Sequence, residues 1–110
     1  MVKYIPDRGD IVWIDFAPQK GIEIKKTRPA IVLSPSLYNV KTELALFAAI
    51  TSICKGYPFE FVIQYNNING VILCDQIRSM DWKERKVSKI TSLETKVVDE
   101  ILFKTRLLLT

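Results

Sequence analysis

Hydrophobic and polar positions follow two different periods along this chain. Up to residue 90, apolar residues come in short runs rich in β-branched and aromatic side chains, separated by Gly, Pro, Asn and Ser. Such runs are typical of β-strands, whereas the segment after residue 91 has the apolar spacing of a helix. The pattern predicts strands over residues 11–16, 28–35, 43–51, 59–65, 71–75, 77–80 and 86–90.

Local signals refine three parts of this pattern. Residues 43–51 are predicted to be a strand because polar residues, Gly and Pro follow them, and a helix remains the alternative. An Asn-Gly pair at 69–70 is the strongest hairpin signal and predicts a turn over residues 66–70. Residues 36–42 predict a short turn or a single helical turn.

The last segment predicts an amphipathic helix. Thr91 and Glu94 have the spacing of a capping box at its start. One face of the helix is expected to hold the apolar positions and one threonine: Val97, Val98, Ile101, Leu102, Thr105, Leu108 and Leu109. Short strands followed by one helix indicate a small, mainly β barrel or sandwich with the helix packed at one end.

Length and composition predict one domain over residues 1–110, because 110 residues with 48 % hydrophobic side chains can fill a single core. No apolar run reaches the roughly 18 residues of a membrane span. The N-terminus lacks the apolar region and cleavage site of a signal peptide, so a cytoplasmic protein without a membrane partner is expected.

The residue types present limit the chemistry. There is no histidine, which excludes Ser-His-Asp and Cys-His catalysis, so acid–base chemistry depends on Glu, Asp, Lys, Arg or Tyr. Cys54 and Cys74 are too few for a closed zinc site and are expected to be buried thiols rather than a disulfide. The net charge of +4 favours a polyanionic partner, such as nucleic acid or an acidic protein segment.

The connection over residues 17–28 is longer than a hairpin requires, and loops of this length are usually functional or disordered. It carries Glu23, Lys25, Lys26 and Arg28. One interpretation is a solvated charged loop. The other is a mobile lid that offers Arg28 and Glu23 to a phosphate.

Four stretches share their order and spacing with a known family. They are PDRGDIVW (6–13); GxE (21–23), followed by RPAIVLSP (28–35) and YN (38–39); AAITS (48–52) with KGYPFE (55–60); and GV (70–71) leading to CDQIRSMD (74–81). Together they cover nearly the whole chain, which resembles the MazF/PemK family of toxin endoribonucleases.

The resemblance implies a small, Src-homology-3-like β-barrel of the MazF/PemK/CcdB toxin type, with a C-terminal helix. It implies a homodimer that acts as a growth-inhibiting toxin and cleaves single-stranded RNA at short sequences, with no cofactor and no metal. The implied products carry a 2′,3′-cyclic phosphate and a 5′-hydroxyl. An acidic antitoxin protein is expected to silence the enzyme by occupying its RNA groove.

The same resemblance implies the site residues. Glu23 is the candidate base, Arg28 fits the charge on the phosphoryl oxygens because a guanidinium offers two parallel donors, and Thr51 is a further donor. Candidate RNA contacts are Lys20, Lys25, Lys26, Ser52, Lys55, Tyr57, Asp75, Gln76 and Arg78.

Several of these roles have alternatives. Asp75 and Gln76 either read a base edge or brace the loop arginine. Tyr57 is a candidate for stacking on a base, whereas Phe59 is expected in the core. Two tryptophans, Trp13 and Trp82, are expected in the core or at a dimer interface.

The chain departs from the family pattern in its loop, where Ile22, Ile24, Lys25 and Lys26 replace small and polar residues. A histidine that some relatives use just before the glutamate is Ile22 here. The alternative functions are a gyrase-poisoning toxin of the CcdB kind and a non-catalytic module that binds RNA or peptides. The retained arginine loop and the C-terminal sequence argue against the first. The second explains the charge but gives no reason for Glu23, Arg28 and Thr51 to occur together.

Overall fold

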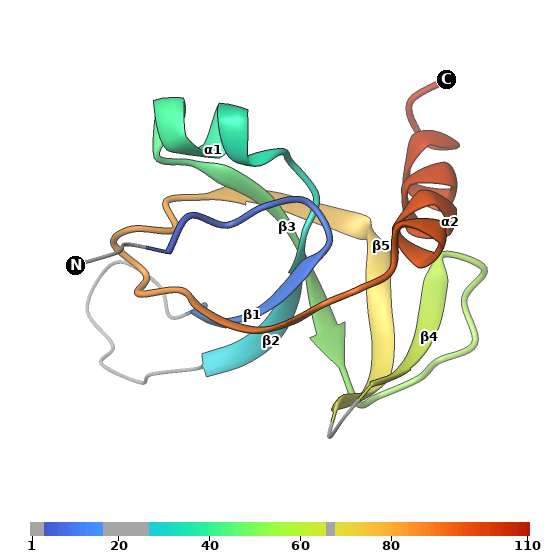
Figure 1. The fold of residues 1–110 in the computed structure, drawn as a ribbon. Helices are drawn as coiled ribbons and strands as arrows, with labels where there is room; N and C mark the ends of the chain where they lie inside the picture. The colour runs from blue at the N-terminus through green and yellow to red at the C-terminus, as the bar shows by residue number, and fades with distance from the viewer. Residues whose placement is uncertain (1–3, 17–26, 66–67) are drawn as a thin grey trace.

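The computed structural model describes residues 4–16, 27–65 and 68–110 (Figure 1). In this part of the chain the elements are β1 (Asp10–Asp15), β2 (Thr27–Val32), α1 (Ser36–Thr42), β3 (Ala45–Thr51), β4 (Glu60–Tyr65), β5 (Ile68–Met80), β6 (Ser88–Ser92) and α2 (Thr95–Arg106). The chain is therefore mainly β with a C-terminal helix, as its sequence predicts.

The strands form one antiparallel sheet in the order β4-β5-β3-β2-β1-β6. The sheet is strongly curled, and α2 lies beside β4 and β5 at one end of it (Figure 1). The strand β1 pairs both with β2, its neighbour in sequence, and with β6 near the end of the chain, where Asp10 lies opposite Ser92. The first and last strands are thereby joined.

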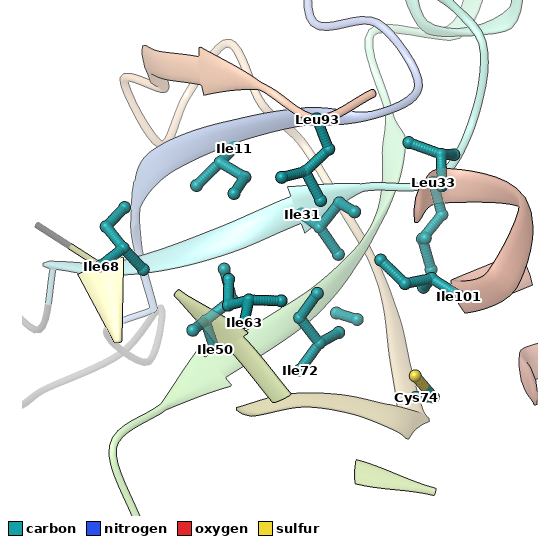
Figure 2. Packing of buried hydrophobic residues seen from close by; sticks show 12 residues of the cluster. Ile11, Ile31, Leu33, Ile50, Ile63, Ile68, Ile72, Cys74, Leu93 and Ile101 are labelled. Carbon is teal, nitrogen blue, oxygen red and sulfur yellow. The ribbon is translucent and has the colours of Figure 1, made fainter. Parts of the chain in front are cut away.

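Both faces of the central strands are buried. Ile11 and Ile31 belong to a larger cluster that also receives Ile101 from α2 (Figure 2). Their neighbours in sequence, Val12 and Val32, point to the other face and belong to a smaller cluster. Because successive side chains of a strand alternate between faces, a strand buried on both faces has a continuous apolar sequence. This explains the unbroken apolar runs in β1, β2 and β3.

The strand β5 corrects two predictions. Tyr65 pairs with Ile68, so the Asn-Gly pair at 69–70 lies inside β5 and not in a turn; residues 66–67 lie outside the described residues. The predicted strands at 71–75 and 77–80 are one continuous strand. Its register against β3 shifts, since Ala48 pairs with Ile77 but Ile50 pairs with Ile72, so β5 carries extra residues at this point.

Both helices lie where the sequence predicts them, but α2 starts later than its predicted capping box. Residues 36–42 form the short helix α1. The helix α2 begins after Glu94, and Thr91 lies in β6, so the predicted capping box is wrong: the backbone at Thr91 pairs with Ile11 instead. Val98, Ile101 and Thr105 of the predicted apolar face are buried. Leu108 and Leu109 follow the end of α2 and are exposed.

Two further predictions concern the region around β3. Residues 45–51 form a strand, so the helical alternative is wrong. Cys74 is a buried free thiol as expected, but Cys54 is exposed because it lies in the loop after β3 and not in the sheet. There is no disulfide between these two residues.

Buried polar groups hold the chain entry onto α1. Asn39 is fully buried, and its side-chain amide donates to the carbonyl oxygens of Pro6 (2.8 Å) and Ser34 (2.9 Å). The indole nitrogen of Trp82 donates to the backbone oxygen of Asn39 at 3.0 Å. These bonds tie three distant segments together, since an unpaired buried polar group would cost roughly 1–3 kcal/mol.

Candidate RNA-cleaving site

Arg28 and Thr51 line one hollow at adjoining strand ends. Ala30 of β2 pairs with Ala49 of β3, and continuing this antiparallel register brings Arg28 opposite Thr51. The hollow has a volume of about 340 Å³, and we call it the arginine hollow. Its lining residues are Trp13, Arg28, Pro29, Ile50, Thr51, Ser52, Ile53, Ile68 and Asn69. The structure thus brings together Arg28, Thr51 and Ser52 as the sequence predicts.

Gly70 explains how β5 can pass so close to Thr51. A Cβ atom at Gly70 would lie 2.3 Å from the carbonyl oxygen of Thr51 and 3.4 Å from the Cα of Ser52. Val71, the next residue, pairs directly with Thr51. The glycine is needed here for close backbone approach, which fixes the end of β3 against β5.

The Thr51 hydroxyl makes a local hydrogen bond to the backbone. Its oxygen accepts a hydrogen bond from the backbone N–H of Ile53 at 3.2 Å. A hydroxyl has one donor hydrogen in addition to its acceptor lone pairs. Thr51 can therefore keep this bond and still donate to a phosphoryl oxygen.

A second hollow adjoins the first, and the two share Thr51 and Ile53. It has a volume of about 240 Å³, and we call it the tyrosine hollow. Its lining residues are Thr51, Ile53, Lys55, Tyr57, Glu60, Leu73 and Gln76. Lys55, Tyr57 and Gln76 were predicted RNA contacts, and all three lie here, next to the candidate catalytic threonine.

Glu60 is a residue of this hollow to which the sequence assigned no role. Its carboxylate accepts backbone N–H bonds from Lys55 (3.1 Å), Gly56 (2.9 Å) and Tyr57 (3.3 Å). The Cys54 thiol also donates to it at 3.4 Å. Partial burial alone would raise the pKa of the Glu60 carboxyl, but these hydrogen bonds outweigh that effect and hold the pKa below its ordinary value.

Other predicted contacts lie apart from the two hollows. Asp75 and Arg78 are exposed on β5, and neither lines the arginine or the tyrosine hollow. The Arg78 guanidinium lies over the Phe16 ring, 5.6 Å from its centroid, as in a cation–π contact. Four predicted site residues lie outside the described residues: Lys20, Glu23, Lys25 and Lys26.

The aromatic predictions are confirmed in part. Phe59 packs against the larger cluster as expected, and Trp82 packs against the smaller one. Trp13 is not in the core: 42 % of it is exposed, and it lines the arginine hollow. Trp13 lies two residues after Ile11 on the same face of β1, and it lines the hollow beside Ile50 and Ile68 of the larger cluster, so it lies at the margin of that cluster. Composition alone gave no signal of this difference.

In the part of the chain that the structure describes, no three His, Cys, Asp or Glu side chains gather as metal ligands would. Within the same residues, neither helix combines the length and apolar content needed to cross a membrane.

The curled antiparallel sheet and the terminal helix define a small β-barrel protein. Its arginine and tyrosine hollows, which adjoin at the strand ends and contain Arg28 and Lys55, form a site suited to an anionic chain. Comparison with known sequences identifies the family. The chain belongs to the family described as PemK-like, MazF-like toxins of type II toxin–antitoxin systems, whose sequence profile matches residues 7–109. The predicted family and the predicted barrel type are confirmed.

Individual relatives agree with this assignment. The endoribonuclease toxin MazF of Escherichia coli strain K12 is 47 % identical over 87 residues, which cover 79 % of this chain and 78 % of that protein. Endoribonuclease EndoA of Bacillus subtilis is 32 % identical over 110 residues, covering 88 % of each chain.

Solved structures show the same fold. A crystal structure of MazF from Deinococcus radiodurans matches with a TM-score of 0.86 at 41 % identity, covering 97 % of this chain and 98 % of that one. A MazE–MazF structure from the same organism matches with a TM-score of 0.89 at 41 % identity, covering 97 % of each chain.

Proposed function

We propose that this protein is an endoribonuclease that cleaves single-stranded RNA and acts as the toxin of a toxin–antitoxin pair. The observation that carries the proposal is the arginine hollow, in which Arg28 and Thr51 meet at the ends of β2 and β3. Relatives named endoribonucleases at 47 % and 32 % identity support the same activity.

The proposed reaction needs no group beyond the protein and RNA. The ribose 2′-oxygen attacks the adjacent phosphorus, its proton passes to a base, and the bond to the 5′-oxygen breaks as that oxygen takes up a proton. The products are a 2′,3′-cyclic phosphate and a 5′-hydroxyl. We propose Glu23 as the base, on the sequence argument alone.

Arg28 and Thr51 supply donors for the charge that develops on the phosphoryl oxygens. A guanidinium stays charged at every physiological pH and can give two parallel hydrogen bonds to a phosphate. Arg28 is exposed in the hollow, so a phosphate can reach it from solvent. The hydroxyl of Thr51 lies on the same lining and offers a third donor.

The tyrosine hollow provides for binding along the RNA. Lys55 supplies charge for a phosphate and Tyr57, half exposed, supplies a ring on which a base can stack. Ser52 and Gln76 add polar groups to the two hollows. Asp75, beside Gln76 on β5, and Arg78 are proposed as contacts outside the hollows.

We further propose that the protein is a cytoplasmic homodimer, inhibited by an acidic segment of a partner protein. The MazE–MazF structures of Deinococcus radiodurans hold such a toxin with its partner. The net charge of +4 suits both RNA and an acidic segment, so the two are expected to compete. RNA affinity should fall steeply with salt, because phosphate contacts release counterions.

The test is end-mapping of RNA cut by the purified protein in EDTA. Cleavage that leaves cyclic phosphate and 5′-hydroxyl ends, abolished when the scissile 2′-hydroxyl is replaced by a methoxy group, supports the proposal. Binding without cleavage would instead support a non-catalytic module, and loss of gyrase activity without RNA cleavage would support a CcdB-like function.

A further inference from the structure

We infer that Glu60 is a positioning residue for RNA binding: its carboxylate holds the loop 53–59 in the shape that places Lys55 and Tyr57 in the tyrosine hollow. This inference rests on the proposed function. Glu60 itself is not assigned any contact with the reacting atoms.

The geometry of the loop carries the inference. Three consecutive backbone N–H groups, those of Lys55, Gly56 and Tyr57, converge on one carboxylate. Consecutive N–H groups can point to one anion only when the backbone turns sharply, and Gly56 has a φ of 84° in the left-handed region. The loop therefore forms an anion-binding turn, and the protein fills it with its own side chain.

The other half of the loop is fixed by different elements. The Pro58 carbonyl oxygen accepts a bond from the Lys104 ammonium of α2 at 2.6 Å, and the Phe59 oxygen accepts one from the Cys74 N–H at 3.0 Å. Glu60 is the first residue of β4 and pairs with Leu73 of β5. Because Glu60 is fixed in β4, its carboxylate also fixes the backbone of Lys55 and Tyr57, the two proposed RNA contacts.

Removing the charge of Glu60 should change RNA affinity in opposite directions, depending on whether the carboxylate positions the loop or only repels phosphate. A carboxylate beside an RNA groove repels phosphate, so removing its charge alone should strengthen RNA binding. If the carboxylate orders the loop, removing it should weaken binding, because Lys55 and Tyr57 lose their fixed positions and must be ordered by the RNA itself. The two explanations predict opposite results for the same variant.

The experiment compares Glu60→Gln with Glu94→Gln. In the native loop all three N–H groups bond Oε1 of Glu60, and the Lys55 N–H also bonds Oε2. Glutamine removes the charge that strengthens these bonds and places an NH₂ donor where one of the two acceptor oxygens was, so it holds the loop more weakly. Glu94 makes no capping bond at the start of α2, so its variant removes the same charge from a site away from the hollows. The probe is a random-sequence single-stranded RNA with 2′-methoxy groups, which can bind but cannot react. Cleavage of an unmodified transcript is measured in parallel under single-turnover conditions.

We expect Glu60→Gln to weaken RNA affinity roughly tenfold, within the range that losing one stacked base produces. Its cleavage rate at saturating RNA should stay within a factor of about two, since an interaction made equally in the ground and transition states changes affinity alone. The backbone amide resonances of Lys55, Gly56 and Tyr57 should shift together. Glu94→Gln should bind as the parent does or slightly tighter.

A thermodynamic cycle sharpens the test. In a Lys55→Ala/Tyr57→Ala background the loop lacks both proposed RNA contacts, so adding Glu60→Gln should weaken RNA affinity no further. Additive losses in that background would overturn the inference, as would unchanged or tighter RNA binding by Glu60→Gln. Glu60→Asp, which keeps the charge on a shorter side chain, should fall between the parent and Glu60→Gln, and it serves if Glu60→Gln proves unfolded by circular dichroism.

The experiment distinguishes a wrong positioning role from a wrong activity. If the parent cuts RNA and Glu60→Gln binds equally well, the positioning role is wrong and the proposed activity stands. If the parent never cuts RNA but its binding depends on Glu60 as described, the proposed activity is wrong and the positioning role stands for a binding module.

Discussion

Gly70 lies so close to Thr51 that a single added carbon would come within 2.3 Å of the Thr51 carbonyl oxygen. Both residues lie in paired strands, so neither backbone can move without disturbing the ladder between β3 and β5. Gly70→Ala should therefore displace the end of β3 that carries Thr51 and Ser52. We expect a loss of roughly 1–3 kcal/mol in unfolding free energy, as for other overpacked sites. Chemical denaturation measures it.

The same variant tests whether the position of Thr51 matters for cleavage. Gly70→Ala should lower the single-turnover rate in protein that is still folded, because the Thr51 hydroxyl is displaced relative to Arg28 in the arginine hollow. Gly56→Ala is the matched control: a Cβ there meets nothing within 4 Å, and only its positive φ opposes the substitution. It should affect RNA affinity more than rate. Equal rates for the parent and Gly70→Ala would show that Thr51 need not be held so closely.

Arg28→Ala should reduce the cleavage rate far more than RNA affinity. If Arg28 stabilises charge that develops as the phosphoryl group reacts, its loss costs a factor of about 100 to 1000 in rate. Arg28→Lys should recover little, because a point charge cannot give the two-pronged contact. Stability should be unchanged, since Arg28 is exposed at a strand end. A variant that cleaves at the parent rate with saturating RNA would make Arg28 a binding residue.

The order of the loop 53–59 should depend on pH in a defined direction. The pKa of Glu60 is held below its ordinary value of 4.5 in the native state, so its stabilising effect is complete above that value. The effect is lost as the pH falls through the lowered native pKa. The amide resonance of Gly56 should therefore titrate with a midpoint below 4.5. A midpoint at or above the ordinary value would contradict the hydrogen-bonded carboxylate, and Glu60→Gln should show no such titration.

The two thiols should differ sharply in reactivity. Cys54 is exposed, whereas burial raises the pKa of the Cys74 thiol above its ordinary value. Because the thiolate is the reactive form, an aromatic disulfide reagent at neutral pH should modify one thiol per native chain and two after unfolding. Cys54→Ser should leave no fast reaction. Rapid modification of both thiols in native protein would show that α2 opens readily over Cys74.

The sequence predicts the elements well wherever a single strand or helix determines the pattern. The strand β3 follows from its apolar run and from the polar residues, Gly and Pro after it, and the amphipathic face around Ile101 follows from helical periodicity. The sequence-based prediction fails where a neighbouring strand determines the backbone conformation. Asn69-Gly70 has the composition of a turn, yet Gly70 is required by the backbone of Thr51, which lies far away in sequence. Thr91 has the composition of a helix cap but is held in β6 by Ile11.

The candidate site follows the same division. Arg28, Thr51, Ser52, Lys55, Tyr57 and Gln76 are found from motif spacing, and the structure gathers them in two adjoining hollows. Trp13 and Glu60 escape sequence reasoning for different reasons. The exposure of Trp13 depends on where the core ends along β1, and the role of Glu60 depends on a loop shape that only Gly56, with its positive φ, hints at.

The pairing of β1 with β6 determines how early the protein can fold during its own translation. Asp10 lies opposite Ser92, and its carboxylate accepts a hydrogen bond from the Ser92 hydroxyl at 2.8 Å, so β1 gains this partner only after residue 92 has been made. Val98 and Ile101 of α2, which complete the larger cluster, arrive later still. Contacts of such sequence separation form slowly and late. A nascent chain therefore has no finished barrel until residue 101 has left the ribosome, so most of its message is translated before the product can fold into a nuclease.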